Sequence, residues 1–286
     1  MAALYREFTT RAEIDAQYDI DLAVPDHEVY SRHYVDASRS AREALRCELD
    51  IPYGPTREER LDIFPAPAAG APVFVFIHGG YWRSLSSKEF SCVALGPHAL
   101  GITTVVVNYA LAPTFSLDEI TRQARAAVAW VSRNIGRHGG NPQRVVIGGH
   151  SAGAHLAAMC LATAWDEDYG LARDPLAGAV LVSGIYDLHP LRHSFLQPPL
   201  QLDDGLIRRN SPLFLVRTCA TPALVTWGGR ESAEFHRQSD AFLTAWRSAG
   251  NRGERRPQEN RNHLDAIYGF EDPNSALCGW MAEATR

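Results

Sequence analysis

Cysteine is scarce in this sequence of 286 residues, which contains five, an odd number with no C-x-x-C pair. Widely spaced single cysteines argue against a disulfide framework and against a structural zinc site, and they favour a reducing compartment. The 11 histidines include no H-E-x-x-H motif, and Pro190 interrupts the closest helical spacing, between His189 and His193. We therefore expect neither a bound metal nor a cofactor.

Long apolar runs and a basic surface are also absent from the sequence. The longest apolar stretches are short runs such as residues 73–77 and 105–107. They are far shorter than the roughly 18 residues that span a bilayer. Lys and Arg total 28 against 33 Asp and Glu, a net charge of -5 with no basic stripe for binding phosphates. No secretory signal pattern opens the chain. These features predict a cytoplasmic protein with a small-molecule substrate, without nucleic-acid or membrane partners, and they leave a homodimer open.

Short apolar runs rich in β-branched residues alternate with longer helical patterns along the chain. This alternation is typical of an α/β fold with a mostly parallel sheet covered by helices. The runs are apolar at successive positions, which indicates strands buried on both faces. They cover residues 72–77, 103–108, 144–148, 179–183 and 222–226.

Two further patterns complete the predicted sheet and one of its helices. Residues 46–51 and 60–64 alternate like an antiparallel hairpin at the sheet edge. Apolar residues recur at steps of three and four between Ile120 and Ile135, which predicts an amphipathic helix that ends near Gly139. We expect a twisted sheet of about eight strands with helices on both faces.

No repeat or linker divides the chain, so we expect one catalytic domain over residues 46–286. Two segments are additions to it. Residues 1–45 are charged and aromatic with a weak helical pattern, and we expect them to wrap the domain or cover its site. The irregular, proline-containing stretch at about residues 189–219 is predicted to form a small cap.

The strongest motif is G-H-S-A-G at residues 149–153, between an apolar strand and an Ala-rich, helix-forming run. This is a G-x-S-x-G motif in the strand–turn–helix context that a nucleophilic serine requires. Glycines two positions before and after Ser151 let strand and helix approach closely, and the helix N-terminus favours developing negative charge. We predict that Ser151 is a nucleophile.

A Gly-rich turn, H-G-G-Y-W at residues 78–82, follows the first buried strand. A tetrahedral intermediate needs backbone N–H groups aimed at its oxyanion, and such a turn can expose them. We expect the N–H groups of Gly80, Tyr81 and Ala152 to form an oxyanion hole, with Gly79 as an alternative donor.

A nucleophilic serine needs a base, and the base needs an acid that orients it. The chain order of nucleophile, acid and histidine is that of α/β hydrolases, and it predicts the triad Ser151, Glu231 and His263. The alternatives are Asp187, Glu234, Asp240 and Asp265 as acid and His236 as base.

Five segments follow one another along residues 70–270: HGGYW, GHSAG, LVSGIYDL, ESAEFHRQS and NHLD. Their order resembles the arylformamidase (kynurenine formamidase) branch of the α/β-hydrolase superfamily. The resemblance implies the α/β-hydrolase fold and hydrolysis of N-formyl-L-kynurenine to kynurenine and formate. In that family an aspartate occupies the acid position, where this chain has Glu231.

The sequence allows more than one interpretation of the substrate and of the function. In the formamidase interpretation Tyr81 and Trp82 flank a flat aromatic leaving group beside the oxyanion hole. The segment NYALAP at residues 108–113 also resembles the hormone-sensitive-lipase-like esterases. The alternative function is therefore a carboxylesterase acting on short-chain or aryl esters, or on related xenobiotic esters or carbamates. A non-catalytic binding protein of this fold is a third alternative, which the complete set of catalytic residues disfavours.

Overall fold

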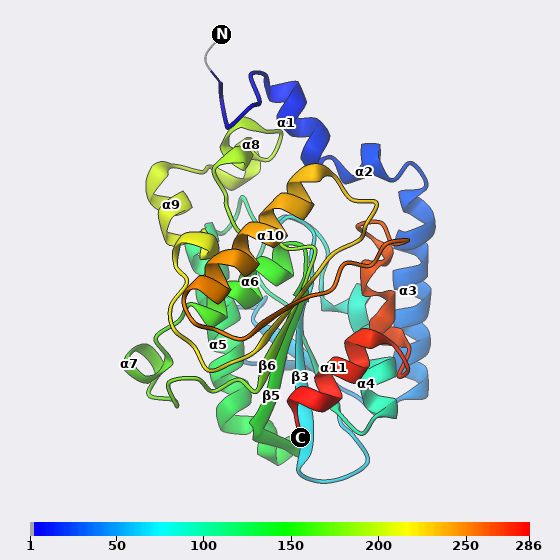
Figure 1. The fold of residues 1–286 in the computed structure, drawn as a ribbon. Coiled ribbons are helices and arrows are strands. Elements are labelled where there is room, and N and C mark those ends of the chain that lie inside the picture. Colours follow the sequence, from blue (N-terminus) through cyan, green and yellow to red (C-terminus); the bar gives the residue numbers. More distant parts are fainter. Residues whose placement is uncertain (1–2) are drawn as a thin grey trace.

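One eight-stranded sheet forms the centre of the computed structural model, which describes residues 3–286 (Figure 1). Its strands are β1 (Glu48–Pro52), β2 (Arg60–Phe64), β3 (Ala71–Ile77), β4 (Thr103–Val107), β5 (Gly140–His150), β6 (Gly178–Val182), β7 (Ala223–Thr226) and β8 (Gly253–Arg255). Their order is β1-β2-β4-β3-β5-β6-β7-β8. The β1–β2 and β2–β4 pairs are antiparallel and all the other pairs are parallel. The predicted fold class is confirmed.

The buried strands follow directly from the apolar runs of the sequence. Every residue of β4, β6 and β7 is buried, because helices cover both faces of the sheet. The predicted hairpin is also present, since Glu48 pairs with Ile63 and Pro52 with Arg60. Strand β8 was not predicted, because a three-residue Gly-Glu-Arg segment at the sheet edge carries no apolar pattern.

Helices on the two faces of the sheet enclose two apolar layers (Figure 1). One layer packs under α1 (Arg11–Tyr18), α5 (Leu117–Asn134), α6 (Ala152–Leu161) and α10 (Ala233–Ser248). The other packs under α3 (His27–Ala44), α4 (Leu95–Ala99) and α11 (Ala276–Ala284). The remaining helices are α2 (Ile20–Ala23), α7 (Trp165–Tyr169), α8 (Gln197–Leu200) and α9 (Asp204–Arg209), with 3-10 turns at η1 (Ser87–Ala94), η2 (Ile135–His138), η3 (Pro190–His193), η4 (Pro212–Phe214) and η5 (Asp265–Glu271).

The N-terminal segment contains the helices α1, α2 and α3, which its weak pattern did not reveal. Helix α1 begins at a capping box, in which Thr10 and Glu13 satisfy each other's backbone N–H groups. Side chains at the start of α10 hold its end, since the Tyr18 hydroxyl donates to Glu234 at 2.8 Å and Ser232 donates to the Gln17 carbonyl at 2.6 Å. The end of α1 therefore lies against the start of α10.

Short helical turns make up the stretch from residue 189 to 219, where α8 lies near α1 at one end of the molecule (Figure 1) and Arg209 of α9 pairs with Asp118 of α5. The Phe195 N–H donates to Asp15 of α1 at 2.6 Å. No helix within residues 3–286 is long and apolar enough to cross a membrane.

Candidate active site

Ser151 occupies a sharp turn between β5 and α6, as the motif predicted. Its backbone has φ 56° and ψ -118°, a sparsely populated conformation for a residue with a side chain. The glycines on either side are sterically required. A Cβ atom on Gly153 would lie 1.9 Å from the Ile77 carbonyl oxygen, and one on Gly149 would lie 2.3 Å from the Gly153 backbone. The Ser151 N–H donates to the Val182 carbonyl at 2.9 Å, which ties the turn to β6.

Glu231 and His263 form a buried hydrogen-bonded pair beside this turn. Glu231 Oε2 lies 2.9 Å from His263 Nδ1, and the two side chains are 0% and 5% exposed. The other carboxylate oxygen, Oε1, accepts hydrogen bonds from Ser183 Oγ and from the Gly228 N–H, each at 2.5 Å. These donors fix the carboxylate, so that Nδ1 of His263 carries the proton and Nε2 remains an acceptor.

Sequence reasoning missed Ser183, which directly follows β6 and shares the edge of the sheet where parallel strands end. Its position at a strand end was the available signal, because functional groups of α/β folds gather there. Gly228 carried no signal, since its contribution is a backbone N–H.

The competing acids and the rival base are all engaged elsewhere. None of them hydrogen-bonds to His263 within the described part of the chain. Asp187 binds Tyr5 and His189, Glu234 binds Tyr18 and Arg237, Asp240 binds Arg255, Asp265 binds Asn262 and Arg261, and His236 approaches the Gly228 carbonyl.

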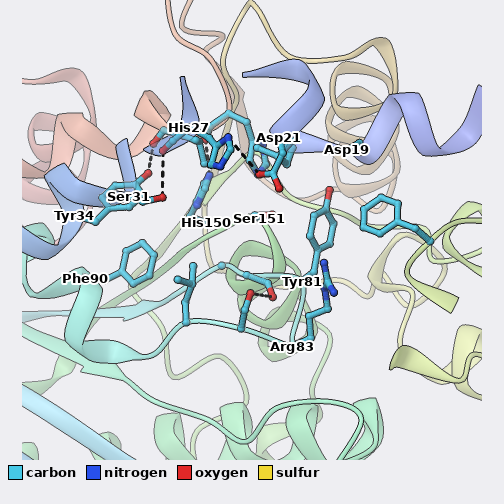
Figure 2. Close-up of a pocket in the computed structure, with 18 residues that line it drawn as sticks. Asp19, Asp21, His27, Ser31, Tyr34, Tyr81, Arg83, Phe90, His150 and Ser151 are labelled. Atoms are coloured by element: carbon cyan, nitrogen blue, oxygen red, sulfur yellow. Dashed lines mark hydrogen bonds and ion pairs between the residues drawn. The ribbon is translucent and has the colours of Figure 1, made fainter. Parts of the chain in front are cut away.

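Ser151 and His263 line one pocket of about 240 Å³ (Figure 2). Within residues 3–286 the Ser151 hydroxyl makes no hydrogen bond to His263, and hydrogen bonds of this kind often tighten only once substrate is bound. His150 supports the histidine from behind, with Nε2 placed 2.8 Å from the His263 carbonyl oxygen. Burial and the nearby His263 ring hold the pKa of His150 well below its usual value. The His150 ring is therefore neutral and donates from Nε2.

The glycine-rich turn after β3 has an unusual backbone. Gly80, Tyr81 and Trp82 have consecutive positive φ values of 103°, 50° and 56°. A Cβ on Gly80 would lie 2.2 Å from the Ser84 carbonyl oxygen, so this position requires glycine. Among residues 3–286 no acceptor binds the N–H groups of Gly80 and Tyr81, and the Ala152 N–H at the start of α6 has no intrahelical partner. Three backbone donors are thus free to bind a ligand.

The His78 ring braces this turn from inside the protein. It stacks between Phe90 and Tyr109, with ring centroids 5.7 and 4.2 Å away, and its Nδ1 lies 2.8 Å from the Gly79 carbonyl oxygen. Complete burial lowers the pKa of His78 to about 4. A neutral ring that donates from Nδ1 therefore holds the Gly79 carbonyl in place.

The structure brings only one of the two expected aromatic side chains to the pocket. Tyr81 lines it, and its hydroxyl donates to the Tyr18 carbonyl of α1 at 2.5 Å. Trp82 is completely buried and does not line the pocket, because its indole N–H donates to His155 Nδ1 at 3.2 Å behind the loop. Phe195, from the 189–219 stretch, lines the pocket instead.

Charged and polar side chains from the N-terminal helices form another part of the pocket wall, together with Arg83 of the glycine-rich turn (Figure 2). Residues 1–45 were expected to wrap the domain or cover its site, but no local pattern singled out these side chains, because the packing of α2 and α3 brings them near Ser151. They are Asp19, Asp21, His27, Ser31 and Tyr34.

Several known proteins are similar to this chain in sequence or in fold. A family profile for the alpha/beta hydrolase fold matches residues 74–264. Kynurenine formamidase from Danio rerio is 33% identical over 257 residues, which cover 86% of this chain and 86% of that protein. Esterase LipQ from Mycobacterium tuberculosis is 34% identical over 223 residues, 70% of this chain and 53% of that protein. A crystal structure of a proposed thioesterase from a Silicibacter species has a TM-score of 0.85 at 26% identity, covering 93% of this chain and 98% of the other.

Proposed function

We propose a mechanism and a substrate for this chain, which belongs to the α/β-hydrolase family, in its kynurenine formamidase-like branch, and is a hydrolase. The chain acts as a serine hydrolase on an aryl formamide, cleaving N-formyl-L-kynurenine to kynurenine and formate. Ser151 is the nucleophile, His263 the general base and acid, and Glu231 the acid that orients the histidine.

The first half of the reaction forms an acyl-enzyme. Ser151 Oγ attacks the formyl carbon while His263 Nε2 takes the hydroxyl proton. Glu231 stabilises the resulting imidazolium through Nδ1, and the N–H groups of Gly80, Tyr81 and Ala152 donate to the oxyanion. The intermediate collapses by breaking the C–N bond, and His263 returns its proton to the leaving arylamine nitrogen.

The second half hydrolyses the formyl ester on Ser151. His263 takes a proton from water as the water oxygen attacks the formyl carbon, and the same N–H groups stabilise the second oxyanion. The C–O bond to Ser151 then breaks, the serine recovers its proton and formate leaves. No cofactor takes part in either step.

The buried Glu231–His263 hydrogen bond beside the strained turn at Ser151 is the single observation that carries this proposal. It supports a triad because the bond to Glu231 occupies Nδ1 and leaves Nε2 of His263 as the acceptor, and because His263 and Ser151 line the same pocket. A glutamate in place of the usual aspartate is accommodated by Ser183 and Gly228, which bind the far carboxylate oxygen.

The formamide substrate is supported by the Danio rerio relative and by the dimensions of the pocket. A volume of about 240 Å³ lies below the roughly 300–1,000 Å³ of pockets for drug-sized ligands. The pocket therefore suits a small acyl group on a single aromatic ring, and Tyr81 and Phe195 provide apolar faces for that ring.

A carboxylesterase acting on short-chain or aryl esters is the second candidate, favoured by the identity to esterase LipQ over 223 residues. The same triad cleaves both bonds, and an ester is the easier one to cleave. A nitrophenyl ester assay therefore does not separate the two functions.

The test is the ratio of kcat/KM for N-formyl-L-kynurenine to that for a phenyl ester of similar size, measured on the purified protein. A formamidase gives a ratio of one or more, although the amide is intrinsically less reactive. A ratio below about one thousandth, roughly 4 kcal/mol of lost transition-state stabilisation, would show that the chain is an esterase.

A further inference from the structure

Charges of both signs line the pocket that contains Ser151, on the side formed by the N-terminal helices and the loop after β3. Asp19 and Asp21 belong to the segment around α2, and Arg83 follows the candidate oxyanion turn. The proposed chemistry at Ser151 uses none of these three groups. They are therefore available to bind a ligand in that pocket.

Arg83 has no anionic partner of its own within residues 3–286. Its side chain makes no ion pair or hydrogen bond there, and its guanidinium carbon lies 5.8 Å from the centre of the Phe195 ring. An arginine offers five N–H donors in a planar fork that matches a carboxylate with two parallel hydrogen bonds. Arg83 is thus a free anion-binding group at the pocket.

The two aspartates provide a matching site for a cation. Asp19 Oδ1 accepts the Leu22 N–H at 3.0 Å, and its second oxygen accepts no hydrogen bond in the described residues. Asp21 Oδ1 lies 3.9 Å from His27 Nδ1, which is too long for a hydrogen bond. Both carboxylates therefore retain acceptor capacity toward the pocket.

The opposite charges lie around Tyr81, next to the candidate oxyanion donors. Figure 2 shows Asp21 and Arg83 toward opposite ends of the Tyr81 side chain. Burial raises the pKa of the Tyr81 hydroxyl. The charges of Glu231, Asp19 and Asp21 raise this pKa further, whereas the charge of Arg83 lowers it. The three groups are thus close enough to act electrostatically on one pocket-lining side chain.

We propose that Arg83 and the aspartates Asp19 and Asp21 are specificity-determining residues that bind a zwitterionic α-amino-acid group on the substrate. Arg83 binds the carboxylate, and the two aspartates bind the ammonium group. The formyl amide is then held at Ser151 while the ring lies against Tyr81. This inference rests on the proposed function, because the amino acid is carried by the arylamine leaving group.

The test compares three formamides that share the ring, the formyl amide and the ketone. N-formyl-L-kynurenine carries both charges, a second compound lacks only the carboxylate, and 2-formamidoacetophenone lacks the whole amino acid. Steady-state kcat/KM is measured for the wild type, Arg83→Gln, Asp21→Asn and Asp19→Asn. Asn at position 19 can still cap α2. The matched control is Arg57→Gln, which removes an exposed arginine from the turn between β1 and β2, outside the pocket.

We expect Arg83→Gln to lower kcat/KM for N-formyl-L-kynurenine by about ten- to a hundredfold, the range for a lost charged hydrogen bond. Its activity on the two compounds without a carboxylate stays within about twofold of the wild type. The aspartate variants lose activity on both ammonium compounds and keep it on 2-formamidoacetophenone. Arg57→Gln leaves all three values unchanged.

Two other outcomes overturn the inference. They differ in whether the proposed formamidase function still stands. If Arg83→Gln lowers all three values equally, or changes none, the amino-acid site is wrong while the formamidase activity stands. If the wild type hydrolyses phenyl esters but none of the formamides, the proposed function fails and the inference fails with it.

Discussion

Replacement of Glu231 by glutamine tests the orientation of the candidate catalytic histidine. The change keeps the shape of the side chain and removes its charge. Glu231 Oε1 accepts from the Gly228 N–H, a backbone donor that cannot turn away, and from Ser183. The amide oxygen of glutamine must therefore occupy the Oε1 position, and its NH₂ group must face His263 Nδ1.

This arrangement forces the wrong tautomer on His263. An NH₂ group at Nδ1 requires an acceptor there, so the ring proton moves to Nε2 and the imidazole can no longer take the proton of Ser151. The analogous aspartate-to-asparagine change in a serine protease lowers kcat by about 10⁴, or roughly 5.5 kcal/mol. We expect a loss of the same order here, because the Glu231–His263 pair is also buried from solvent.

The assay is hydrolysis of p-nitrophenyl acetate, which reports the triad whichever substrate the chain prefers. Two variants serve as controls. Glu231→Asp keeps the charge and should lose far less activity than the glutamine variant. Asp187→Asn changes an acid that binds Tyr5 and His189 and makes no hydrogen bond to the triad within residues 3–286, so its activity should stay near that of the wild type.

Near-UV circular dichroism checks that Glu231→Gln remains folded, which is expected because both Oε1 hydrogen bonds are retained. A folded Glu231→Gln protein with activity within tenfold of the wild type would refute the reasoning. So would a collapse of activity in Asp187→Asn, since that result would identify a different acid.

Three further predictions concern stability and can be measured by urea unfolding. Gly153→Ala should cost about 3 kcal/mol because its Cβ would lie 1.9 Å from a carbonyl oxygen of β3; a change below 1 kcal/mol would contradict this steric account. Burial lowers the pKa of His78 and of His155 to about 4, so these histidines bind protons at higher pH in the unfolded chain than in the folded one. Each should therefore lower the free energy of unfolding by about 3 kcal/mol as the pH falls from 6.5 to 4. A flat stability profile over that range would be evidence against neutral buried rings. His150→Leu should cost about 1–3 kcal/mol by leaving the buried His263 carbonyl without its donor, and an unchanged unfolding free energy would show that this contact is unimportant.

The central sheet was predictable because its strands are buried on both faces. Such strands lack an alternation of polar and apolar residues, as in β6, and this pattern can be read from the sequence alone. Ser151 was predictable for a similar reason, because the steric demand of the turn leaves two obligatory glycines beside it. Local constraints of this kind determine residue types, so they can be read from the sequence.

The remaining parts of the site depend on contacts between distant segments. Asp19 reaches the pocket because Tyr18 binds Glu234, 216 residues further along the chain, and no local pattern reports that contact. Trp82 was expected beside the substrate, but its backbone has a positive φ of 56° and its indole N–H donates to His155 in the core. Backbone conformation of this kind is not readable from residue type when the residue is not glycine.

The most direct measurement of the central claim is release of formate from N-formyl-L-kynurenine by the wild type and by Ser151→Ala. The wild type should release formate and kynurenine in equal amounts. The variant should be folded and slower by roughly 10⁶, the loss seen when a serine nucleophile is removed from a complete triad. Formate release by Ser151→Ala at a rate near that of the wild type would contradict the account.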